Sequence, residues 1–125
     1  MTETTQDRAG PDTRFGAAHG RVLLSGVQAL VRSVLDQRRA DAEAGTDTDT
    51  GAYVSGYQGS PLGTIDLEFA RQSALLDELG IVFRPGVNEE LAATAVAGSQ
   101  LAAGRPEHTV EGVLGVWSCC PAKRW

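Results

Sequence analysis

The sequence has no long apolar run, no surplus of basic residues and no spaced set of cysteines. Its apolar stretches are far shorter than the about 20 residues that a membrane-spanning helix needs, and residues 1–20 lack the apolar core of a signal peptide. A formal net charge of −5 argues against binding to nucleic acid, which requires a clustered basic surface. These absences predict a cytoplasmic protein that has neither a membrane segment nor a nucleic-acid partner.

Residues suited to holding a metal ion are also few and badly placed. The only two cysteines, Cys119 and Cys120, are adjacent, so they provide neither a structural disulfide framework nor the spacing of a zinc or iron–sulfur site. His19 and His108 have no second ligand at metal-binding spacing. The alternating acids of residues 45–51 lack the central glycine and the closing glutamate of a calcium-binding EF-hand loop. The sequence therefore predicts no metal site.

The apolar residues that are present recur with the periods of helices and strands, and glycines stand at the ends of these segments. The predicted elements are a helix over 21–44, a strand over 52–56, a helix over 64–79, a strand over 81–84, a helix over 91–103 with Asn88 as its N-cap, and a strand over 110–117. The alternation of helices and strands predicts an α/β fold with an incomplete, doubly wound parallel sheet of three strands.

The two ends of the chain differ from its middle in composition. Residues 1–20 are rich in Thr, Asp, Arg and Gly and are predicted to be a disordered leader. Residues 21–117 are predicted to form one partial α/β domain. Residues 118–125 form an atypical tail, without a cap or a period, where a loop and a further helix are expected. We therefore expect the chain to be a truncated form of a longer protein, with a meagre core.

Two loops of the predicted sheet hold the residues with functional potential. Gly56-Tyr57-Gln58-Gly59-Ser60-Pro61-Leu62-Gly63 follows the first strand, and residues 84–90 follow the second. Because ligands of open α/β sheets bind at the carboxyl ends of the strands, we expect these loops to meet at such a site. The glycine spacing matches neither a dinucleotide-binding fingerprint nor a Walker loop, and no lysine follows to reach a phosphate.

Both loops have two interpretations on residue type alone. The glycines of the first loop form either a tight turn or a surface that a ligand approaches closely, with Ser60 offering a hydroxyl group at a helix N-terminus. Tyr57 either lines a pocket or packs beneath the loop. Glu89 and Glu90 either complement the dipole of the helix that follows, or include a buried carboxylate that exchanges a proton near neutral pH.

The two loop sequences together resemble a known family. Gly56-Tyr57-Gln58-Gly59-Ser60-Pro61, followed about 30 residues later by Asn88-Glu89-Glu90-Leu91-Ala92-Ala93-Thr94-Ala95-Val96-Ala97-Gly98-Ser99, is similar to the N-terminal region of 2-oxoacid:ferredoxin oxidoreductases. The similarity is greatest to the large fused indolepyruvate ferredoxin oxidoreductases of bacteria, and it covers residues 21–117. In that family the segment binds the pyrimidine ring of thiamine diphosphate. The resemblance therefore implies the pyrimidine-domain half of a thiamine diphosphate-binding fold.

The resemblance also implies roles for individual residues. Glu89 matches the glutamate that activates thiamine, whereas Glu90 does not align with it. A carboxyl group hydrogen-bonded to the pyrimidine ring favours the imino form of the ring, which takes a proton from the thiazolium carbon. Ser60 matches a serine or threonine beside the substrate, and Gly59 gives it room. Asn88 belongs to the same cofactor-binding segment as Glu89.

The rest of the enzyme that the resemblance implies has no counterpart in the sequence. No Gly-Asp-Gly…Asn pattern for the diphosphate and Mg²⁺ occurs, so a domain from another segment or chain has to supply that half of the site. The full enzyme also contains iron–sulfur clusters, uses ferredoxin and coenzyme A, and forms a homo-oligomer. The predicted function is thus part of an oxidoreductase that decarboxylates 2-oxoacids, with the isolated chain inactive. The alternatives are a non-catalytic α/β interaction module and a small phosphate- or nucleotide-binding domain.

Overall fold

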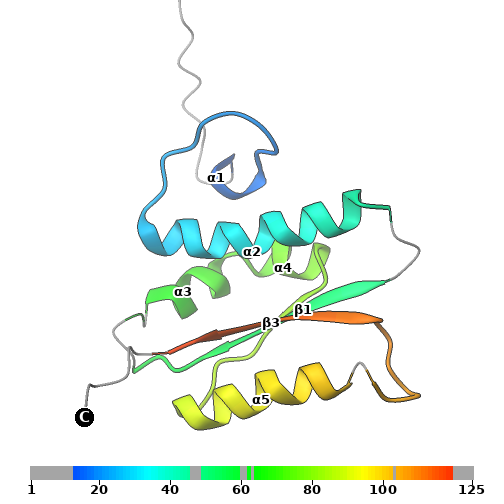
Figure 1. Ribbon diagram of the computed structural model, residues 1–125. Helices are drawn as coiled ribbons and strands as arrows, with labels where there is room; N and C mark the ends of the chain where they lie inside the picture. Colours follow the sequence, from blue (N-terminus) through cyan, green and yellow to red (C-terminus); the bar gives the residue numbers. More distant parts are fainter. Residues whose placement is uncertain (1–12, 46–48, 60–61, 63, 103, 120–125) are drawn as a thin grey trace, which may run out of the picture.

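The computed structural model describes residues 13–45, 49–59, 62, 64–102 and 104–119. Helices and strands alternate along the chain around one small sheet (Figure 1). In chain order the elements are α1 (Thr13–Gly16), α2 (Gly26–Glu43), β1 (Thr50–Gly56), α3 (Thr64–Arg71), α4 (Ser73–Glu78), β2 (Ile81–Phe83), α5 (Glu89–Ala102) and β3 (Gly112–Ser118).

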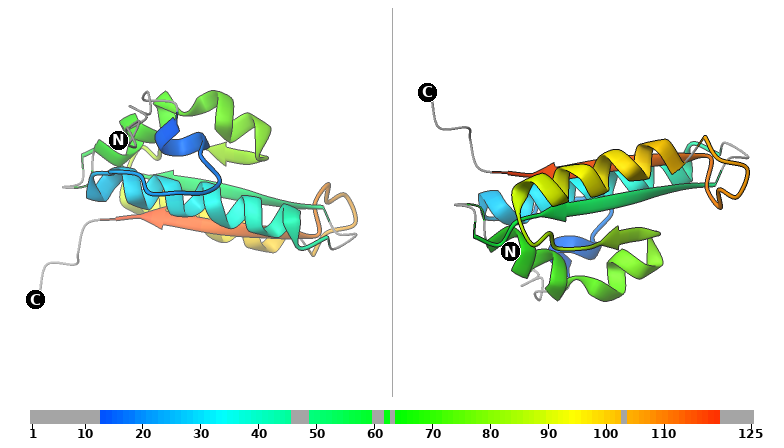
Figure 2. Two further views of the ribbon diagram at one scale, coloured as in Figure 1. Left: turned by 90° about the horizontal axis from the view of Figure 1, so that it is seen from above. Right: turned by 90° about the horizontal axis from the view of Figure 1, so that it is seen from below.

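The three strands found in the described residues are parallel and lie in the order β2-β1-β3. Ala52 in the central strand pairs with Ile81 on one side and with Leu114 on the other. Helices α3 and α4 connect β1 to β2 on the face that also carries α2, whereas α5 connects β2 to β3 on the opposite face (Figures 1 and 2). The predicted α/β class with a small, open parallel sheet is confirmed.

The largest buried side chains lie between the sheet and the layer formed by α2, α3 and α4. The ring of Phe69 is fully buried and stacks on the ring of Phe83, with their centroids 5.3 Å apart. The buried apolar core consists of Phe15, Val31, Val34, Leu35, Ala52, Val54, Ile65, Phe69, Leu76 and Ile81. On the other face, Ala92 is the one buried residue of α5. The hydrophobic core is therefore built mainly on one side of the sheet.

Helix α2 begins later than predicted because a capping box sets its N-terminus. Ser25 Oγ accepts a hydrogen bond from the Gln28 amide (3.2 Å), and the Gln28 side chain accepts one from the Ser25 amide (3.0 Å). Farther along α2, the buried Arg38 donates to the Leu79 carbonyl (3.1 Å) and to Thr50 Oγ1 (2.6 Å). Arg38 thereby joins α2 to the start of β1 and to the turn that precedes β2.

The helix predicted over 64–79 is in fact two helices, α3 and α4, which are separated at Gln72. Gln72 has non-helical backbone angles (φ −96°, ψ 19°), and its amide donates to the Phe69 carbonyl (3.0 Å) across three residues instead of four. Phe69 before the break and Leu76 after it are both buried. The change of direction therefore lets both helices contribute to the core, which apolar periodicity alone does not reveal.

Part of the leader that was expected to be disordered is ordered. Residues 13–20 are described, and α1 packs Phe15 into the hydrophobic core. Arg39 of α2 donates to the Phe15 carbonyl (2.6 Å), and Arg32 donates to two further carbonyls of the same segment. One aromatic side chain and two arginines thus attach residues 13–20 to the rest of the fold, and residues 1–12, the remainder of the predicted leader, lie outside the described residues.

Candidate functional site

The carboxyl ends of the strands lie at one edge of the sheet, because all three strands are parallel. β1 ends at Gly56, β2 at Phe83 and β3 at Ser118. The loops after β1 and β2 run side by side at this edge. The Gly86 amide donates to the Gly56 carbonyl (2.8 Å), and Tyr57 forms a parallel bridge with Gly86. The prediction that these two loops meet is confirmed.

A close contact brings the start of α5, and with it Glu89, to this edge. A Cβ atom on Gly86 would lie 2.7 Å from the Cβ atom of Ala92, so glycine is needed for the loop after β2 to fold against the first turn of α5. Asn88 Oδ1 accepts a hydrogen bond from the Leu91 amide (2.7 Å) and caps the helix. The predicted N-cap is confirmed, and it holds the residue next to it, Glu89, at the beginning of the helix.

The Glu89 side chain is half-buried, whereas one interpretation of the sequence expected full burial. Within the described part of the chain, no residue forms a hydrogen bond or an ion pair with its carboxylate. The neighbouring Glu90 is exposed. Glu89 therefore presents, at the carboxyl edge of the sheet, an acid that is shielded on one side and remains available to a ligand on the other.

The loop after β1 folds over its own tyrosine. A Cβ atom on Gly59 would lie 2.4 Å from the ring of Tyr57, so the tyrosine ring lies directly against this glycine. Tyr57 thus contacts its own loop while it remains 37% exposed. Ser60, the predicted substrate-binding residue, lies outside the described residues, as do Pro61 and Gly63. The room that Gly59 gives to Ser60 therefore stays a prediction.

Ser118, at the end of β3, is a hydroxyl residue of this edge that the sequence analysis did not select. A Cβ atom on Gly56 would lie 1.8 Å from Ser118 Oγ, so the serine side chain fills the space beside that glycine. Ser118 belongs to β3 and not to an irregular tail, and the residues after Cys119 lie outside the described part. The sequence could have identified Ser118, because it is the first polar residue after the apolar residues 113–117.

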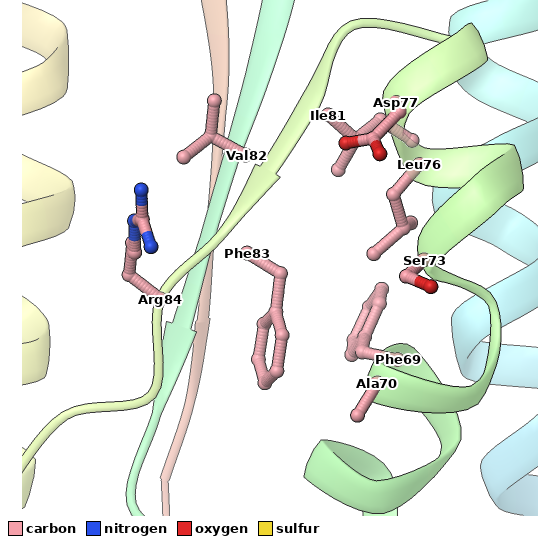
Figure 3. A pocket seen from close by; sticks show the side chains of 9 residues that line it. All are labelled: Phe69, Ala70, Ser73, Leu76, Asp77, Ile81, Val82, Phe83 and Arg84. Carbon is pink, nitrogen blue, oxygen red and sulfur yellow. The ribbon is translucent and has the colours of Figure 1, made fainter.

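Among the cavities that the described residues form beside the sheet, two are considered for a ligand, and neither is lined by Asn88 or Glu89. One cavity, of about 300 Å³, opens between α2, α3 and the end of β3, and its mainly apolar lining includes Leu30, Val34, Ile65, Val116, Trp117 and Cys119. The other, of about 250 Å³, lies between β2 and the helices α3 and α4. Phe69 and Phe83 face each other there, whereas Val82 and Arg84 point to the other side of β2 (Figure 3).

One buried acid is not among the predicted site residues. Asp66, in the first turn of α3, is 3% exposed, and its Oδ2 atom has no hydrogen-bond partner among the described residues. Loss of hydration raises the pKa of the Asp66 carboxyl group above its ordinary value. Sequence reasoning missed this residue because acids in a first turn are usually explained by the helix dipole.

Comparison of the chain with models of protein families, with curated proteins and with solved structures gives no match in any of the three. In the ranges that the structure describes, no three His, Cys, Asp or Glu residues gather closely enough to hold a metal ion. The helices of those ranges include none with both the length and the apolar character to cross a membrane. The function of the chain is therefore inferred from the geometry of the carboxyl edge and from the resemblance of its two loops.

Proposed function

We propose that this chain is the pyrimidine-binding part of a thiamine diphosphate-dependent 2-oxoacid:ferredoxin oxidoreductase of the indolepyruvate type. The observation that carries the proposal is the position of Glu89, which begins α5 beside the loop after β1 and has a carboxylate that no described residue engages. The resemblance requires the thiamine-activating glutamate in this segment. The open parallel sheet, wound on both faces, is compatible with the pyrimidine-domain half of that fold.

The side chains at this edge suit a flat heterocycle. The edge is bounded by Gly56, Gly86 and Ser118, none of which carries a bulky side chain. The cap made by Asn88 holds the start of α5 in place before a ligand arrives, so the Glu89 carboxyl group is positioned in advance. The half-buried Glu89 carboxyl group is thus in place to form a hydrogen bond with a pyrimidine nitrogen.

Thiamine diphosphate supplies, when bound, the thiazolium carbon that attacks the carbonyl group of a 2-oxoacid. In this proposal, the residues of this chain promote removal of the proton from the thiazolium carbon. The Glu89 carboxyl group would form a hydrogen bond with the pyrimidine ring nitrogen and would thereby make the amino group on the same ring a better base. The outer side of Glu89 is open, in keeping with a second domain that binds the diphosphate and covers the ring.

We place the apolar group of the substrate in the cavity beside the end of β3, which adjoins the carboxyl end of that strand although neither Asn88 nor Glu89 lines it. Its volume of about 300 Å³ falls at the lower limit of small-molecule pockets. Carbon atoms from Ile65, Val116 and Trp117 line it, and Ser118 and Cys119 add polar atoms on the strand side. An indole group matches such a lining better than the methyl group of pyruvate does, which supports the indolepyruvate type.

Thiamine binding by the full chain tests the role of Glu89 directly. In a titration followed by NMR, we expect the pyrimidine signals of thiamine to shift and broaden with the wild-type chain and with the Glu90→Gln variant. The Glu89→Gln variant should lose most of this effect. Glu90→Gln is the matched control, because it removes the same charge from the next residue. Equal binding by the wild-type and Glu89→Gln chains would contradict the proposal.

The catalytic role requires the missing half of the site. We expect the chain alone to show no turnover of indolepyruvate or pyruvate. Together with the separately produced diphosphate-binding domain of a 2-oxoacid:ferredoxin oxidoreductase, it should accelerate exchange of the thiazolium proton with solvent. Glu89→Gln should then slow the exchange about 10²–10⁴-fold, the usual contribution of a positioned acid–base group. Exchange at the rate of the Glu90→Gln control would exclude an activating role for Glu89.

A non-catalytic interaction module is a second candidate, which the uncovered edge of the sheet favours. β3 is a terminal strand whose seven residues include neither a charge nor a proline, although natural edge strands usually carry such protection against pairing with other chains. In that case Glu89 would act only as a helix-end charge. The module predicts that Glu89→Gln behaves as the wild type in both experiments above.

A further inference from the structure

Helix α5 has an outer face that no described part of the chain covers. Leu91, Thr94, Gly98 and Leu101 follow one another at spacings of three, four and three residues, which puts them on one side of the helix. All four residues are exposed, Leu91 at 52% and Leu101 at 74%. The opposite side of the helix packs on β1 and β3. Two leucines thus flank the middle of a helix face that is open to solvent.

Gly98, in the middle of this face, is not explained by packing against any described residue. Glycine inside a helix is less stable than alanine, so its presence calls for a close approach. A Cβ atom on Gly98 would meet no atom within 4 Å. By contrast, a Cβ atom on Gly115 would lie 2.9 Å from Val96 and 2.7 Å from Gln100, so packing within the chain explains that glycine. The approach that Gly98 permits is open only to something outside the described residues.

The outer face is apolar even though it contains a threonine. Thr94 Oγ1 donates to the Glu90 carbonyl (2.8 Å), so its hydroxyl group is already satisfied within the helix. Between Glu90 and Arg105 the sequence contains no charged residue. A partner therefore meets a carbon surface and does not have to remove water from a charge.

Charges of opposite sign stand at the two ends of this face. Glu89 and Glu90 lie at its N-terminal end, and Arg105 lies in the turn that follows its C-terminal end. Glu90 and Arg105 are both exposed, and neither forms an ion pair with a described residue. Glu107 lies two residues beyond Arg105 in the same turn, so the complementarity of two antiparallel copies depends on the individual pairing of Glu90 with Arg105.

We propose that α5 pairs antiparallel with α5 of a second copy of this chain, across a two-fold axis near the middle of the helix. Leu91 of each copy then lies at the level of Leu101 of the partner subunit, and Gly98 lets the two backbones approach closely. Glu90 lies near Arg105 of the partner subunit, and the two helix dipoles oppose each other favourably. This pairing does not depend on the role proposed for Glu89.

The size of the face sets the expected strength of the dimer. The 14 residues of α5 extend about 21 Å at the usual helical rise. One face of such a helix buries less area than the about 800 Å² that each partner contributes to a standard interface. We therefore expect a dimer that dissociates in the micromolar range, visible in solution as a monomer–dimer equilibrium.

Sedimentation equilibrium of the full chain, from about 1 μM to about 1 mM, covers this range of affinity. Leu101→Glu should raise the dissociation constant of the dimer at least about tenfold, because it places a charge in the apolar contact. Leu67→Glu is the matched control, since Leu67 is a leucine on α3 with 57% exposure; it should leave the equilibrium unchanged.

Gly98→Ala separates an interface role from a structural one. Alanine favours the helix, so the monomer should unfold at a higher temperature, whereas the added methyl group at the crossing should weaken the dimer. A structural role for Gly98 within one copy would instead lower the unfolding temperature. An interface role therefore predicts a higher unfolding temperature together with a higher dissociation constant of the dimer, whereas a structural role predicts a lower unfolding temperature.

Charge reversal tests the antiparallel orientation. Glu90→Arg and Arg105→Glu should each weaken the dimer, and the double variant should restore it. A chain that stays monomeric at every concentration, or a dimer that Leu101→Glu and Leu67→Glu affect equally, would overturn the proposal. So would a dimer that is lost with Trp117→Glu but kept with Leu101→Glu, since that result assigns the interface to the free edge of β3. The thiamine titration is unaffected by any of these outcomes.

Discussion

The two faces of the sheet are covered in different ways. On one face, α2, α3 and α4 bury large side chains such as Phe69 and Leu35. The buried Arg38 adds hydrogen bonds from α2 to the start of the sheet. On the other face, α5 buries Ala92 and sets half-buried residues against the close-packed Gly115. One face is packed with large buried side chains, and the other with α5 side chains that lie close to Gly115.

The two layers of helices also differ in the roles that we assign to them. The layer of α2, α3 and α4 completes a hydrophobic core within the described chain, so most of the free energy of folding is expected to come from that side. The layer of α5 carries the features that point outward, namely Glu89 at the carboxyl edge and the uncovered Leu91 and Leu101. Five substitutions, which include a control, test how the free energy of folding is distributed over the structure.

The largest effect is expected from truncation in the well-filled layer. Phe69→Ala removes a fully buried ring that stacks on Phe83, and it should lower the free energy of unfolding by about 3–5 kcal/mol. On the other face, Val96→Ala removes half-buried carbon and should cost only about 1 kcal/mol. Denaturant unfolding measures both values. Equal losses would show that the two faces contribute alike.

A smaller loss is expected at the polar link between α2 and the sheet. Arg38→Ala removes the hydrogen bonds to Leu79 and Thr50 and should cost about 2–3 kcal/mol, because the donor is charged and nearly buried. Arg71→Ala is the control: its ion pair with Glu68 involves an arginine that is 71% exposed, and such pairs contribute at most about 1 kcal/mol. If Arg71→Ala lowered the free energy of unfolding as much as Arg38→Ala does, burial would not determine how strongly these arginines stabilise the fold.

The smallest effect should be a gain in stability that depends on pH. The folded-state pKa of Asp66 lies above its unfolded value because burial disfavours the charged form. The resulting destabilisation is absent below the unfolded pKa, where both states are protonated, and it is complete above the folded pKa. Asp66→Asn should therefore raise the free energy of unfolding by about 1 kcal/mol near pH 7 and leave it unchanged near pH 3. The same gain at both pH values would contradict burial of a charge as the cause.

The order of the elements was predictable because it depends on local spacing. Apolar periodicity and the glycines at element ends led to the helix–strand alternation, and the alternation led to a parallel sheet. Boundaries were less predictable where side chains decide them. The cap formed by Ser25 and Gln28 moved the start of α2, and the turn at Gln72 divided one expected helix. Phe15 was not expected in the core, because the residues around it are polar.

The candidate site was predictable only in outline. The meeting of the two loops followed from parallel strands, and Asn88 as an N-cap followed from its residue type. The half-burial of Glu89 and the contact of Ser118 with Gly56 depend on packing between distant segments, which spacing does not encode. Likewise, the glycine at position 59 could serve a ligand or a neighbouring ring, and the structure shows the ring of Tyr57.

The attachment of α1 has a practical consequence for studying the chain. Arg39 and the buried Phe15 fasten α1 to α2, on the side of the sheet away from α5 (Figure 1). A fluorescent reporter fused ahead of Thr13 would start from that far side. Copies that carry a donor and copies that carry an acceptor should then exchange freely. Energy transfer between them would measure the proposed pairing of α5 with α5, because neither label lies next to that helix.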